Sequence, residues 1–181
     1  GVVISASHNP YEDNGIKFFG SDGKKLSDAV EAEISAAMKK YDTLPKPHGT
    51  EIGRISYHRM WVDQYAEQVR ATARGRLDGI KVIMDCANGA ACDIAPNIFR
   101  SLGADVQAFF TSPDGVNINR KCGSTELDAI KSFKSLYPGQ VALAFDGDCD
   151  RVLMIDENGN TVDGDAMMAI LAIGMKERGE L

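Results

Sequence analysis

The chain has 181 residues, of which 44% are hydrophobic and 25% are charged, and its formal net charge is −6. This length is sufficient for one large domain or two small ones with a hydrophobic core. The acidic balance argues against nucleic acid or an anionic membrane as the main partner. An acidic protein that binds a phosphorylated substrate needs local cations or a metal ion to do so.

The cysteines and the longest apolar run narrow the class of protein further. Cys86, Cys92, Cys122 and Cys149 form no C-x-x-C pair, so free thiols in a reducing compartment are expected rather than a zinc site. The longest apolar run, 166–175, is shorter than the roughly 20 residues that a membrane-spanning helix needs. We therefore expect a cytoplasmic chain with no membrane partner.

The N-terminal part begins with an apolar strand at 1–4, which gives way to small, polar and turn-forming residues at 5–10. Apolar residues at helical spacing predict a helix over 27–41 and a second over 57–74. The segment between them, 43–53, holds two prolines and two glycines and is predicted to be a loop.

The pattern changes after residue 77. Apolar strands are predicted at 80–85, 106–110 and 141–145, and helices at 94–102 and 125–137 lie between them. This alternation is typical of a parallel sheet with helices on both faces. The predicted fold class is α/β.

The expected domain organisation has three parts. Residues 77–162 form a three-layer αβα domain with a mostly parallel sheet. The residues on either side of this unit are expected to be pieces of neighbouring domains.

Three aspartates follow the strand at 141–145. Asp146, Asp148 and Asp150 alternate along the chain, at the end of a strand where α/β proteins bind ligands. Three carboxylates so close together repel one another unless a cation neutralises them, and oxygen ligands suit Mg²⁺ or Ca²⁺. A solvated acidic turn is the alternative. An EF-hand is excluded because Arg151 stands where that loop needs glycine.

Two stretches together carry a family resemblance. SASHNP at 5–10, followed by DNGIK at 13–17, and DGDCDR at 146–151 resemble the α-D-phosphohexomutase family. GVNIN at 115–119 and CGST at 122–125 are most similar to the branch of that family that acts on hexosamine phosphates.

The resemblance implies a phosphoryl shuttle. Ser7 matches the serine that carries a phosphoryl group, and Asp146, Asp148, Asp150 and a phosphate oxygen on Ser7 match the ligands of one Mg²⁺ ion. Phospho-Ser7 would give its phosphoryl group to a hexosamine monophosphate. The bound 1,6-bisphosphate would then turn and return its other phosphoryl group to the serine.

Three further residues match positions beside these groups. Lys17 matches the residue that removes the proton of the sugar hydroxyl, which requires a lysine whose pKa is lowered by burial or neighbouring cations. Electrostatic pairing with the phosphate is the alternative role for Lys17. His8 and Arg151 are expected to orient groups and stabilise charge.

The resemblance also implies that other parts of the enzyme are missing. The family has four domains around a cleft, and the resemblance implies that residues 1–76 are the C-terminal part of domain 1, residues 77–162 domain 2 and residues 163–181 the start of domain 3. We therefore expect a fragment that is inactive alone. We also expect it to expose apolar surface, through which a homo-oligomer could form. Two alternatives remain for function. One is a member of the family that acts on mannose or glucose phosphates, and the other is a non-catalytic metal-binding α/β module.

Overall fold

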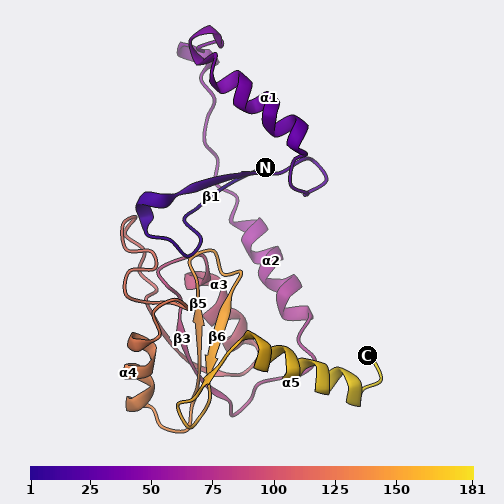
Figure 1. The fold of residues 1–181 in the computed structure, drawn as a ribbon, viewed down its shortest axis with the longest axis vertical. Helices are drawn as coiled ribbons and strands as arrows, with labels where there is room; N and C mark the ends of the chain where they lie inside the picture. The colour runs from indigo at the N-terminus through magenta and orange to yellow at the C-terminus, as the bar shows by residue number, and fades with distance from the viewer.

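The computed structural model describes residues 1–181. Figure 1 shows an α/β unit at one end, a helix at the other and a hairpin between them. The elements, in chain order, are β1 (Val2–Ser5), β2 (Gly15–Phe18), α1 (Asp28–Met38), α2 (Arg59–Ala71), β3 (Lys81–Asp85), α3 (Ala91–Ser101), β4 (Asp105–Phe109), α4 (Asp128–Leu136), β5 (Val141–Phe145), β6 (Val152–Ile155), β7 (Thr161–Val162) and α5 (Gly164–Glu177).

The larger sheet has the strand order β4-β3-β5-β6-β7. Strands β4, β3 and β5 are parallel, as the alternation of strands and helices predicts. Strand β6 pairs antiparallel with β5, and the short β7 pairs antiparallel with β6. The six residues 146–151 between β5 and β6 allow a hairpin but are too few for a parallel crossover.

Helices cover both faces of this sheet, and the predicted fold class is confirmed. Because side chains alternate along a strand, Val82 and Met84 of β3 join the core cluster on the α3 side, and Ile83 joins the other cluster with Ile130 of α4. Strand β3 is therefore buried on both faces, as a central parallel strand should be.

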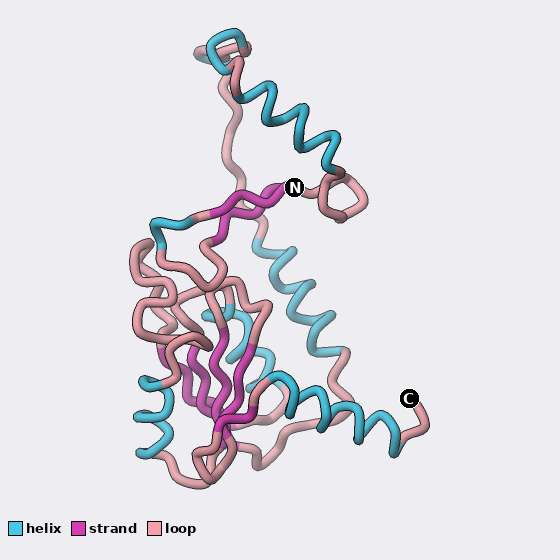
Figure 2. Tube along the Cα trace, viewed as in Figure 1, coloured by secondary structure: helices cyan, strands magenta, loops and turns pink.

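The N-terminal region is more open. Strands β1 and β2 form an antiparallel hairpin in which Ser5 lies opposite Gly15, and the nine residues 6–14 connect them. Figure 2 shows α1 far from the larger sheet and α2 running back towards it. Neither helix has a buried residue, although α2 contacts α3.

The predicted helices and strands are found, with shifted ends. Strand β4 ends at Phe109, one residue earlier than predicted, because Phe110 has a φ of 52°, which is incompatible with a strand. Strand β2 and the two-residue strand β7 were not predicted. No helix is both long and apolar enough to span a membrane.

Candidate active site

The loop that follows β1 presents Ser7 in a tight turn. The amide of Asn9 donates to the carbonyl of Ala6 at 2.9 Å, and the amide of Ser7 donates to the hydroxyl of Ser5 at 2.9 Å. Ser7 has a φ of 52°, a left-handed conformation that costs a non-glycine residue about 1–3 kcal/mol and is typical of functional sites. The same turn leaves the Ser7 hydroxyl free to face the α/β unit.

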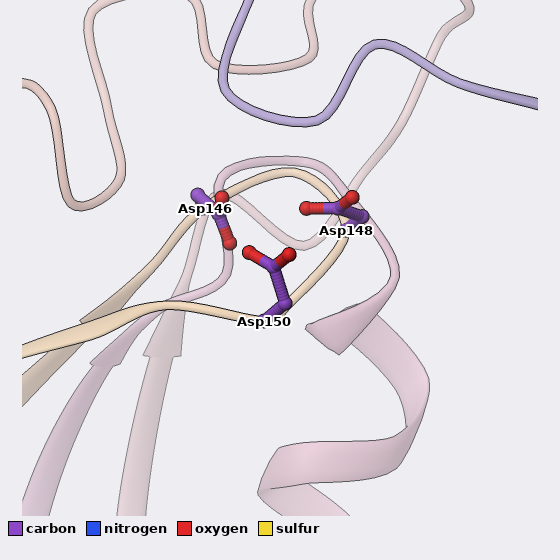
Figure 3. Close-up of side chains that lie close together, drawn as sticks. All are labelled: Asp146, Asp148 and Asp150. Carbon is purple, nitrogen blue, oxygen red and sulfur yellow. The ribbon is translucent and has the colours of Figure 1, made fainter. Parts of the chain in front are cut away.

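The loop that follows β5 gathers the three predicted carboxylates. One oxygen from each of Asp146, Asp148 and Asp150 lies within 4.8 Å of the others, and Figure 3 shows the side chains turned towards one another. The loop curls because the amide of Cys149 donates to the carbonyl of Asp146 at 3.1 Å. The prediction that these three carboxylates lie close together is confirmed.

The environment of Asp146 fits a bound cation. Its side chain is 1% exposed, and its Oδ2 accepts no hydrogen bond, although Nε of Arg151 lies 3.6 Å from this oxygen. Burial first, and then the charges of Asp148 and Asp150, raise the pKa of this carboxyl, although the backbone amide of Arg151 opposes the shift. A buried oxygen without a donor, beside two more carboxylates, is the ligand set that a hard divalent cation prefers.

The two loops meet at Asp148. The hydroxyl of Ser7 donates to Oδ1 of Asp148 at 3.2 Å, and Nζ of Lys17 donates to Oδ2 at 3.1 Å. Burial tends to raise the pKa of Asp148, but the hydrogen bonds from Lys17 and Ser7 outweigh it and lower the pKa. One carboxylate of the metal loop thus holds both the serine and the lysine of the N-terminal region.

His8 and Arg151 form a further link between the serine loop and the carboxylate cluster. Nη2 of Arg151 donates to Nδ1 of His8 at 2.9 Å. A guanidinium has only donors, so Nδ1 accepts here and the ring proton is on Nε2. Nδ1 is also 3.5 Å from the hydroxyl of Ser7, and Nε of Arg151 lies 3.6 Å from Asp146 and 3.5 Å from Asp150.

Gly147 was not predicted as a site residue. A Cβ at this position would lie 2.4 Å from the carbonyl oxygen of Ser7 and 2.8 Å from Nδ2 of Asn119. The two loops can approach this closely only because residue 147 has no side chain. The signal available in the sequence was a glycine between two predicted metal ligands.

Asp85 was also missed. It is fully buried at the end of β3, and its two oxygens accept the amides of Ala87 at 2.9 Å and Gly123 at 2.7 Å. Burial raises the pKa of this carboxyl to about 6, and the two amides oppose that shift. Asp85 joins the loop after β3 to the segment 112–123, which reaches the serine loop. The only sign of Asp85 in the sequence was a lone aspartate as the last residue of a buried strand.

Comparison with known proteins identifies the family. Residues 1–45 match the family model for phosphoglucomutase/phosphomannomutase, alpha/beta/alpha domain I, and residues 59–159 match the model for domain II. The chain belongs to the phosphoglucomutase/phosphomannomutase family, which confirms the resemblance that the two loops carry.

Curated relatives cover the whole chain. It is 51% identical to a phosphoglucosamine mutase of Acetivibrio thermocellus and 49% identical to one of Moorella thermoacetica. All of this chain is aligned in both cases, against 40% and 41% of the relatives. The chain therefore spans about two fifths of the length of these relatives.

Solved structures show the same fold. A phosphoglucomutase/phosphomannomutase family protein of Burkholderia thailandensis aligns with 98% of this chain and 38% of its own, with a TM-score of 0.73 at 23% identity. An N-acetylglucosamine-phosphate mutase in its apo form aligns with 98% of this chain and 55% of its own, with a TM-score of 0.61 at 16% identity. At these identities the likeness supports the fold alone.

Proposed function

We propose that this chain supplies the phosphoserine and metal loops of a phosphoglucosamine mutase, which interconverts glucosamine 6-phosphate and glucosamine 1-phosphate. The observation that carries the proposal is the hydrogen bond from the Ser7 hydroxyl to Asp148, a member of the carboxylate cluster. The names of the relatives that match the whole chain support the choice of substrate.

The proposed metal site consists of one oxygen each from Asp146, Asp148 and Asp150, with phosphorylated Ser7 as the fourth ligand. A bound Mg²⁺ ion supplies positive charge next to the phosphoryl group, which carries about −1.5 to −2 charges on its own. The buried Oδ2 of Asp146 that lacks a donor supports this assignment.

The proposed reaction consists of two phosphoryl transfers, one from Ser7 to the sugar phosphate and one from the sugar bisphosphate back to Ser7. In the first transfer the bond between phosphorus and Oγ of Ser7 breaks, and a bond forms between phosphorus and a hydroxyl oxygen of the sugar phosphate. The product is a hexosamine 1,6-bisphosphate, and the hydroxyl proton leaves to a base. The Oγ freed in the first transfer takes up a proton. In the second transfer the bond between the other phosphorus and its sugar oxygen breaks, and a bond forms between that phosphorus and Oγ of Ser7. The Ser7 hydroxyl proton leaves to a base and the sugar oxygen takes up a proton, which gives the monophosphate isomer.

We propose Lys17 as the base, with a resting position on Asp148. Its Nζ and the Ser7 hydroxyl bind the two oxygens of one carboxylate, so the amine lies beside the group that carries the phosphoryl. Against this role, the Lys17 side chain is 49% exposed and is paired with the carboxylate of Asp148. The electrostatic role therefore remains the alternative for Lys17.

Arg151 and His8 are proposed to stabilise charge on the transferring group. Arg151 lies near two members of the carboxylate cluster and donates to the ring of His8, which faces the Ser7 hydroxyl. These contacts place a cation and a ring beside the serine without requiring either to accept a proton.

The proposed division of the chain has three parts. Residues 1–76 carry the serine loop, residues 77–162 carry the metal loop, and residues 163–181 begin a further domain. The family models cover 1–45 and 59–159 separately, so the match to domain II begins at the start of α2, before the proposed boundary at residue 77.

The test is the mass of the chain before and after exposure to a hexosamine 1,6-bisphosphate with Mg²⁺, with fragmentation to locate added phosphate. We expect one phosphoryl group on Ser7 and none on Ser5, because the Ser5 hydroxyl is turned to the Ser7 amide rather than to the carboxylates. Ser7→Ala should stay unmodified.

Two outcomes would contradict the proposal. Phosphate on Ser5, or on both serines equally, would mean that the contact with Asp148 does not determine which serine is phosphorylated. An unmodified Ser7 in the longest form of the protein that carries this sequence would favour a non-catalytic metal-binding module.

A further inference from the structure

One residue of the α/β unit binds the backbone of the serine loop directly. Nδ2 of Asn119 donates to the carbonyl of Ser7 and to the carbonyl of Asn9, both at 2.8 Å. A side-chain amide has two N–H donors, and both are used on carbonyls that flank His8. The contact joins segments more than 100 residues apart in the chain.

Asn119 is itself firmly anchored to the sheet. Its amide donates to the carbonyl of Ala87 at 2.9 Å, just beyond the end of β3. Its φ is 57°, a left-handed conformation that asparagine adopts more readily than most residues. The side chain thus extends from a fixed backbone into the space between the two loops.

One of the two carbonyls that Asn119 binds belongs to Ser7, whose backbone is in the left-handed region. Ser7 has a φ of 52°, and its carbonyl oxygen accepts no other hydrogen bond than the one from Asn119. On its other side this carbonyl lies against Gly147 of the metal loop. Rotation of this peptide would also move the hydroxyl away from Asp148.

We infer that Asn119 is a positioning residue, which fixes the turn at Ser7 so that the hydroxyl faces the carboxylate cluster. The inference rests on the proposed function only for its catalytic consequence. The structural part, a clamp on the carbonyls of Ser7 and Asn9, stands on the two hydrogen bonds alone.

The test compares Asn119→Gly and Asn119→Asp with Lys121→Gly. Glycine keeps the left-handed backbone and removes both donors, and aspartate keeps the size of the side chain while replacing the amide with an acceptor. Lys121 lies in the same loop with a φ of 53°, is exposed, and makes no side-chain hydrogen bond, so Lys121→Gly controls for the backbone change.

The first readout is the rate of Ser7 phosphorylation by a hexosamine 1,6-bisphosphate, measured by intact mass at a series of concentrations. Both Asn119 variants should lower the maximal rate about 10–100-fold, as supporting residues of a site do. The concentration that gives half-maximal rate should not change, and Lys121→Gly should behave as the unsubstituted chain. Equal maximal rates in all four proteins would overturn the inference.

The second readout is hydrogen exchange of the Asn9 amide, which donates within the serine turn. Exchange should be faster in both Asn119 variants and unchanged in Lys121→Gly, with the amides of β3 unaffected in all. If Ser7 takes no phosphate even in the longest form of the protein that carries this sequence, the proposed function fails, and exchange alone decides the clamp. Unchanged exchange at Asn9 in both variants would overturn it.

Discussion

The two regions that meet at the site differ in how they are held together. Every buried residue of the chain except Ala6 lies between Val82 and Ile155, within the α/β unit. The hairpin and α1 have open surfaces, and Ile4 on β1 is 69% exposed. The metal loop therefore rests on a packed core, whereas the serine loop depends on a few polar contacts with that core for its position.

Because of this difference, we expect substitutions to disrupt the site in two distinguishable ways. Changes in the α/β core should unfold the unit that carries the carboxylates. Changes at the boundary should leave that unit folded while Ser7 no longer faces Asp148. The following predictions distinguish them, beginning with the largest effect.

Substitution of Lys17 should give the largest loss of phosphoryl transfer from Ser7 to a hexosamine monophosphate. If Lys17 is the base, Lys17→Met and Lys17→Arg should both lower the rate about 10²–10⁴-fold, because a guanidinium does not release its proton. Stopped reactions of the pre-phosphorylated protein, in the longest form that carries this sequence, measure this rate. Lys24→Met, at an exposed position with no ion pair, serves as the control.

The opposite pattern would identify the electrostatic role. A Lys17→Arg variant that keeps most of the rate while Lys17→Met loses it would show that charge, and not proton transfer, is what this position contributes.

Truncation of one isoleucine in each region should show the difference in packing. Ile83→Ala removes a side chain that is 0% exposed and should lower the free energy of unfolding by about 2–5 kcal/mol. Ile4→Ala, on the exposed hairpin, should change it by about 0.5 kcal/mol or less. Urea titrations of the α/β unit, followed by circular dichroism, measure both values. Equal losses would mean that the hairpin is packed as tightly as the sheet.

Asp85 should make the stability of the α/β unit depend on pH. Its pKa is raised from the usual 3.8 to about 6 in the folded chain, so the folded state binds this proton more tightly than the unfolded state. The resulting stabilisation is complete below pH 3.8 and is lost as pH rises through 6. It amounts to about 3 kcal/mol.

The measurement is the free energy of unfolding between pH 4 and 7 for the unsubstituted chain, Asp85→Asn and Asp105→Asn. The decline with rising pH should be smaller in Asp85→Asn, and Asp105→Asn, an exposed position on β4, should retain it. Parallel pH profiles for all three proteins would contradict the assignment of a buried carboxyl that titrates near 6.

The sequence was sufficient for features that depend on local pattern. The apolar runs of β3 and β5, each followed by polar residues, predicted the central strands, and alternating aspartates after β5 predicted the carboxylate cluster. Both follow from side-chain periodicity and from the place of ligands in α/β sheets. Ser7, Lys17, His8 and Arg151 came from the family resemblance instead, and the structure brings all four to the cluster.

Features that depend on contacts between distant segments were not predictable. No local pattern shows that Asp148 binds both Ser7 and Lys17, or that Gly147 must lack a side chain to face the serine loop. Asn119 stood in a stretch that only supported the family resemblance. Its two hydrogen bonds exist because the α/β fold carries segment 112–123 to the edge where the hairpin docks.

If the serine loop and the carboxylate cluster form one site, the affinity of the protein for Mg²⁺ should depend on Ser7. Calorimetric titration should compare the unsubstituted chain, its Ser7-phosphorylated form, Ser7→Ala and Ser27→Ala, whose hydroxyl in the N-terminal region makes no capping bond. We expect the tightest binding for the phosphorylated chain, weaker binding for Ser7→Ala than for the unsubstituted chain, and no effect of Ser27→Ala. Equal Mg²⁺ affinity in all four proteins would contradict a shared site, because the aspartates would then bind metal independently of Ser7.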